Sequence, residues 1–61
     1  MINLSTIRNQ VDFKKDKYGN IEDNIYNVFF EGEQYRVVCK NGYVDIFLNG
    51  VCLNLVNEIR Q

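Results

Sequence analysis

Three short turn sequences divide the second half of the chain into segments of strand length. Asn41-Gly42 and Asn49-Gly50 are Asn-Gly pairs, which suit the positive φ angles of a type I′ hairpin turn. Gly32-Glu33 suits a type II′ turn, in which Gly takes the first central position. Each turn joins neighbouring antiparallel strands, so we expect a four-stranded meander with strands at about 24–31, 34–40, 43–48 and 51–56.

The same turns predict which residues lie opposite each other. They place Phe29, Arg36, Phe47 and Cys52 in one row across the four strands. Because side chains alternate between the two sides of a strand, one side of the sheet receives only apolar residues. We call this side the first face and expect it to be the core: Tyr26, Val28, Phe30, Tyr35, Val37, Cys39, Val44, Ile46, Leu48, Val51, Leu53 and Leu55.

The opposite side, the second face, has a composition that a solvated sheet face does not need. Antiparallel sheets with one wet side usually alternate cleanly between apolar and polar residues. Here aromatic and aliphatic residues stand beside an arginine, the composition of interface hot spots, with Arg36 expected between two aromatic rings. The predicted protein-binding residues are Phe29, Arg36, Val38, Tyr43, Phe47 and Val56. The alternatives are that these residues only stabilise the sheet, or that residues 1–20 cover them.

The first twenty residues permit two interpretations. Leu4, Ile7, Val11 and Tyr18 fit a helical stripe, with Ser5 as a cap and Gly19 as a stop. This predicts an α+β fold with an N-terminal helix packed on one face of the sheet. The alternation Val11, Phe13, Lys15 instead favours a fifth strand and a small all-β barrel.

Length and composition predict one small domain over residues 1–61, with a helical segment at 1–20 and the sheet at 24–57. The chain has no His, and its two cysteines fall on opposite faces, so neither a metal centre nor a disulfide is expected to strengthen the core. A homodimer or a tight protein partner is therefore expected. Free thiols and the lack of a long apolar segment predict a cytoplasmic protein without a membrane span.

No residue set predicts catalysis. Ser5, Thr6 and the cysteines lack a histidine base, and the carboxylates Glu31 and Glu33 lie at a solvated hairpin tip. We expect no enzymatic activity and no cofactor.

Two classes of function remain. The first is a non-enzymatic protein-binding module, in its most concrete form a phage or mobile-element inhibitor or modulator of a host enzyme or defence system. That form rests on the small size and on a composition rich in Asn and Ile without Ala, Pro or Trp, as an AT-rich genome would encode. The second class is single-stranded nucleic-acid binding on the same aromatic face, which the net charge of −1 disfavours. A small structural or assembly protein would use the same surface.

Overall fold

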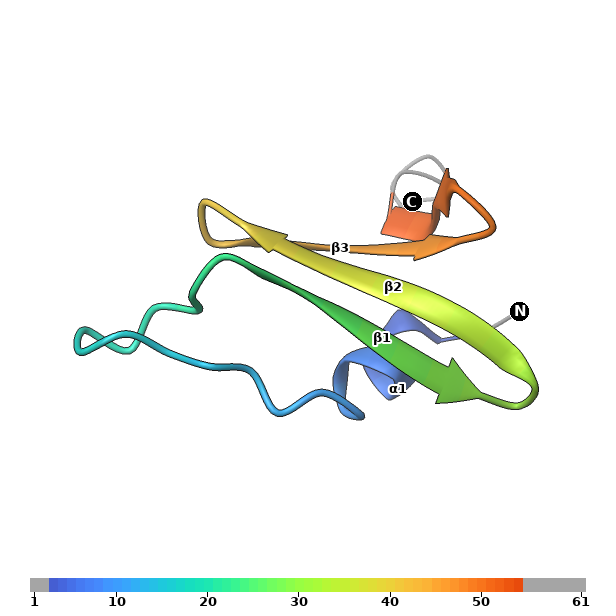
Figure 1. Cartoon of the computed structure of the whole chain (residues 1–61), viewed down its shortest axis with the longest axis horizontal. Coiled ribbons are helices and arrows are strands. Elements are labelled where there is room, and N and C mark those ends of the chain that lie inside the picture. The colour runs from blue at the N-terminus through green and yellow to red at the C-terminus, as the bar shows by residue number, and fades with distance from the viewer. Residues whose placement is uncertain (1–2, 55–61) are drawn as a thin grey trace.

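A computed structural model describes residues 3–54, which form one short helix and a four-stranded antiparallel sheet (Figure 1). The elements are α1 (Leu4–Arg8), β1 (Asn24–Phe30), β2 (Glu33–Lys40), β3 (Tyr43–Leu48) and β4 (Val51–Cys52). The strands lie in the order β1-β2-β3-β4, so every hairpin joins neighbours. In this part of the chain the sheet is open, and the alternative of a closed barrel with a fifth strand is wrong.

The three hairpin turns share one backbone conformation. Both central residues of each turn have positive φ, as a type I′ turn requires. The first turn consists of Glu31 and Gly32, so the predicted turn at Gly32-Glu33 is wrong by one residue. Gly takes the second central position in all three turns: Glu31 (φ 50°) with Gly32 (80°), Asn41 (51°) with Gly42 (81°) and Asn49 (52°) with Gly50 (81°).

The displaced turn changes the register of β1 against β2. Val28 lies opposite Tyr35, where the sequence predicted Val37. A shift of two residues keeps the alternation of side chains, so the predicted first face is still the buried one. The core consists of Ile7 with Val28, Tyr35, Val37, Cys39, Val44 and Ile46. Val51 departs from the prediction because it is exposed, and Leu55 lies outside the described residues.

The N-terminal segment is helical for one turn only. Asn3, not Ser5, caps α1, and its side-chain oxygen accepts a hydrogen bond from the Ser5 backbone N–H at 3.0 Å. Beyond the helix, Val11 and Phe13 are partly buried against the core with strand-like alternation. The predicted longer helix is therefore wrong after Arg8.

Gly19 closes a turn rather than a helix. Its N–H donates to the Asp16 carbonyl at 3.0 Å, and a single antiparallel bridge joins Lys15 to Ile21. Tyr18, predicted to lie on the helical stripe, is 76% exposed at the tip of this turn. The side chains of Val11 and Phe13 therefore alternate as the fifth-strand interpretation predicted, but this segment adds no strand to the sheet.

The last strand is shorter than predicted. β4 ends at Cys52, and the side-chain amide of Asn54 occupies the edge of β3 in its place. The Ile46 N–H donates to Asn54 Oδ1 at 2.7 Å, and Asn54 Nδ2 donates to the Val44 carbonyl at 3.1 Å. One side chain therefore supplies the acceptor and the donor that a longer strand would have supplied.

No helix within residues 3–54 has the length and apolar character needed to cross a membrane.

Candidate interaction surface

The second face of the sheet keeps large apolar side chains in contact with solvent. Ile25 is 57% exposed, Phe29 75% and Tyr43 73%, whereas Val38 and Phe47 are partly buried. All five lie on the side of the sheet that faces away from the core cluster. The sheet thus has one packed side and one open side.

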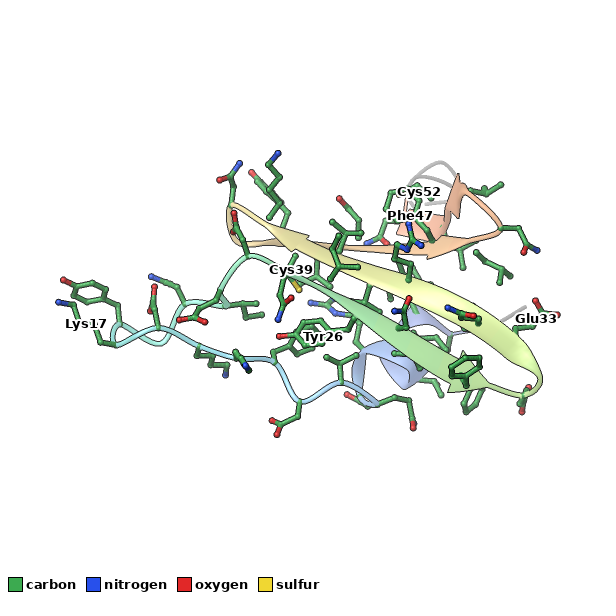
Figure 2. All side chains as sticks on the ribbon, viewed as in Figure 1. Lys17, Tyr26, Glu33, Cys39, Phe47 and Cys52 are labelled. Atoms are coloured by element: carbon green, nitrogen blue, oxygen red, sulfur yellow. The ribbon has the colours of Figure 1, made fainter. Side chains whose placement is uncertain are left out.

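The row of residues around Arg36 differs from the prediction. Arg36 lies opposite Asn27 on β1 and opposite Phe47 on β3, and Phe47 in turn lies opposite Cys52. Figure 2 shows Phe47 and Cys52 beside each other on β3 and β4. Phe29 lies opposite Gln34, because the first turn closes one residue earlier than predicted. The predicted placement of Arg36 between two aromatic rings is therefore wrong.

A hollow of about 460 Å³ opens on the second face. Arg36, Val38 and Phe47, three of the predicted binding residues, line it together with Ile25, Asn27, Gln34, Asn49 and Gly50. Alternation placed the first four of those additional positions on the second face, but nothing in the sequence indicated that they would enclose a depression.

The other predicted binding residues are more scattered. Phe29 and Tyr43 lie on the same face but outside the lining of the hollow, near the ends of β1 and β3. Val56 lies outside the described residues. The structure therefore joins half of the predicted set into one site and leaves two aromatic residues as separate exposed positions.

Among the residues that the structure describes, Arg36 is the one cation in the lining of the hollow. Its neighbours across the strands are the Asn27 amide and the Phe47 ring, and its neighbours along β2 on this face are Gln34 and Val38. None of these four is a carboxylate. A guanidinium among amides and apolar side chains is well placed to meet an acidic group from another molecule.

The buried cysteine offers no activated nucleophile. Cys39 is buried on the first face, and burial raises the pKa of its thiol above the ordinary value of 9.0. The charge of Arg8 partly offsets this rise in pKa, and the charge of Asp23 adds to it. The thiol is therefore protonated and unreactive at neutral pH. Cys52 is also free and lies on the second face. In residues 3–54 no three Cys, Asp or Glu side chains gather in a way that would hold a metal ion.

No known protein family, curated protein or solved structure matches this chain.

Proposed function

We propose that this protein is a small non-enzymatic protein-binding module that presents the second face of its sheet to a partner. In its most concrete form it is an inhibitor or modulator of a host enzyme or defence system, encoded by a phage or another mobile element and acting in the host cytoplasm. The composition supports this source, since the chain is rich in Asn and Ile and contains no Ala, Pro or Trp.

The observation that carries the proposal is the contrast between the two faces. The first face meets Ile7 and other apolar residues of the N-terminal segment, whereas the second face leaves Phe29 and Tyr43 about three-quarters exposed. A partly apolar depression on a sheet face that also exposes aromatic side chains is typical of a binding site. Aromatic residues and arginine together are enriched at the centres of such sites.

The hollow defines the kind of partner surface that would fit. An apolar side chain entering it would lie between Val38 and Phe47, and a carboxylate beside that side chain would reach Arg36. A charge-assisted pair with the guanidinium would add orientation and specificity to the apolar contact. In the strand pairs that flank Arg36, no acidic residue lies directly opposite it; Asp45 lies on the same face, opposite the neighbouring Val38.

The test is affinity capture from bacterial lysate with the immobilised full chain, read by mass spectrometry. Captured proteins should be lost with Phe47→Ser and Arg36→Glu. They should be retained with Tyr18→Ser, a matched control because Tyr18 is as exposed as Phe29 but lies away from the sheet. A partner that all three variants retain equally would contradict the proposal, as would a wild-type chain that captures nothing.

Single-stranded nucleic-acid binding is the second candidate, because Lys40 and Arg36 share the second face with the exposed ring of Tyr43. Titration with single-stranded oligonucleotides at several salt concentrations tests it. Binding that weakens steeply as salt rises favours this candidate, and no binding at low salt eliminates it. A small assembly protein would use the same face, and would show self-association without a foreign partner.

A further inference from the structure

The two edges of the sheet differ in how well they are closed. At one edge β4 has only two residues, and the Asn54 side-chain amide hydrogen-bonds to the adjoining backbone N–H and C=O groups of β3. At the other edge β1 runs for seven residues, Asn24–Phe30, without a charge or a proline. Proteins usually protect a long edge strand with charged residues, prolines or bulges, because its free backbone groups can pair with another strand. β1 has none of these three protections. The segment after α1 packs on the first face of β1, where the Lys14 N–H donates to the Tyr26 hydroxyl at 3.1 Å, but within the described residues it makes no backbone hydrogen bond to the outer edge of the strand.

The hairpin geometry shows which groups of β1 point outward. Residues beside a two-residue turn exchange both backbone hydrogen bonds, and this alternates along the strand. Phe30, Val28 and Tyr26 therefore bond to β2, whereas the backbone of Ile25, Asn27 and Phe29 faces outward. The Ile25 N–H confirms the direction, because it donates to the Asn24 side chain at 2.8 Å rather than to β2. In the described part of the chain, no intrachain acceptor meets the N–H groups of Asn27 and Phe29.

We propose that β1 pairs in antiparallel fashion with β1 of a second copy, about a two-fold axis at Asn27, to form one continuous sheet. This inference rests on the edge of the sheet and is independent of binding through the second face. The axis places Asn27 opposite Asn27 of the second copy and Ile25 opposite its Phe29. On the first face it places Tyr26 opposite Val28 of the second copy.

This register is the one that the strand sequence favours. At its centre this register pairs Asn27 with Asn27, Ile25 with Phe29 and Tyr26 with Val28, and it brings the exposed side chains of Ile25 and Phe29 together. Only at the ends of the strand does it set an amide, Asn24, opposite an apolar residue, Phe30. Moving the axis to Tyr26 would place Ile25 opposite Asn27 of the second copy. Moving it to Val28 would place Phe29 opposite Asn27. Cross-strand apolar pairs stabilise a sheet, so the axis at Asn27 is preferred.

The absence of charged residues in β1 also favours a second copy of the chain as the partner of this edge. A strand without charges meets its own copy without electrostatic repulsion, and each copy contributes its outward N–H groups to the new ladder. A core of this size gains from association, because so small a chain buries little apolar surface alone. In the paired sheet both second faces lie on the same side, so the two hollows face the same direction.

Analytical ultracentrifugation of the full chain across a concentration series tests the pairing. The wild type should dimerise. Asn27→Lys and Asn27→Glu should each weaken the dimer by about tenfold or more, because like charges would meet at the axis. A mixture of these two variants should recover the dimer, since opposite charges then meet. Lys40→Glu is the matched control: it also changes the charge at an exposed position of the second face, but on the interior strand β2.

Each outcome decides the proposal. A monomeric wild type would overturn it, as would a dimer that Asn27→Lys leaves intact or a mixture that stays monomeric. Loss of the dimer in Lys40→Glu would assign the contact to the second face instead. Two-dimensional NMR spectra of each variant at low concentration separate loss of pairing from loss of folding. The result of this experiment does not decide whether a foreign partner binds through Phe47, so the dimer proposal and the proposed function can fail independently.

Discussion

At the scale of single residues, the three positive-φ positions explain both the accuracy and the error of the turn prediction. Asn tolerates the left-handed region because its short side chain bonds locally, so Asn41-Gly42 and Asn49-Gly50 were predictable. Glu31 adopts the same conformation at φ 50° without that advantage. The sequence therefore indicated Gly32 as the start of the turn, whereas Gly32 is its second residue.

This difference predicts a stabilising substitution. Glu31→Asn should raise the free energy of unfolding by about 1 kcal/mol, because it relieves the left-handed strain of a long side chain. Urea unfolding followed by circular dichroism measures the change. The reverse exchange at an equivalent turn, Asn41→Glu, is the control and should lower stability by a similar amount. Equal stability of all three proteins would contradict the assigned turn.

At the scale of secondary-structure elements, periodicity was a good guide to β2 and β3 and a poor one to both ends of the chain. The Asn41-Gly42 turn joins these two strands directly, and their side chains alternate between the two faces, which leaves one register. The helix was overestimated because Val11 fits the stripe of Leu4 and Ile7, although it packs from an extended segment.

The end of β4 and the hollow had no sequence signal. The Asn54 side chain bonds to the backbone of β3 where a longer β4 would have paired. Such a contact does not change the pattern of apolar residues, which by itself predicts that β4 continues past Cys52. The hollow combines residues of β1, β2, β3 and the Asn49-Gly50 turn, so no local pattern could indicate it. Alternation alone predicted that Arg36, Val38 and Phe47 share one face, and all three line the hollow.

The role of Asn54 can be tested with a nearly isosteric change. Asn54→Asp keeps an acceptor for the Ile46 N–H but sets a carboxylate oxygen against the Val44 carbonyl. Stability at neutral pH should fall by about 1–3 kcal/mol in urea unfolding. The loss should shrink in acid, where protonation of the introduced carboxyl restores a donor. Asn3→Asp adds the same charge at an exposed position where the side-chain oxygen accepts hydrogen bonds from Ser5, a role that a carboxylate keeps, and should change stability little. An undiminished stability in Asn54→Asp would show that the amide does not close this edge.

At the scale of the whole molecule, the account depends on a sheet with one packed side and one open side. Every fully buried apolar strand residue lies on the first face, and the large exposed side chains Ile25, Phe29 and Tyr43 lie on the second. For a chain of 61 residues the expected free energy of unfolding is only about 3–5 kcal/mol. Loss of one core side chain should therefore unfold it, whereas loss of a second-face side chain should not.

Adjacent residues of β3 provide the most direct measurement, which is urea unfolding of Ile46→Ser and Phe47→Ser side by side. Ile46 is fully buried and Phe47 lines the hollow on the opposite face. Ile46→Ser should abolish the cooperative transition, because the cavity and the buried hydroxyl together cost about 3–5 kcal/mol. Phe47→Ser should unfold cooperatively, within about 1 kcal/mol of the wild type. A folded Ile46→Ser protein, or an unfolded Phe47→Ser protein, would contradict the assignment of the two faces.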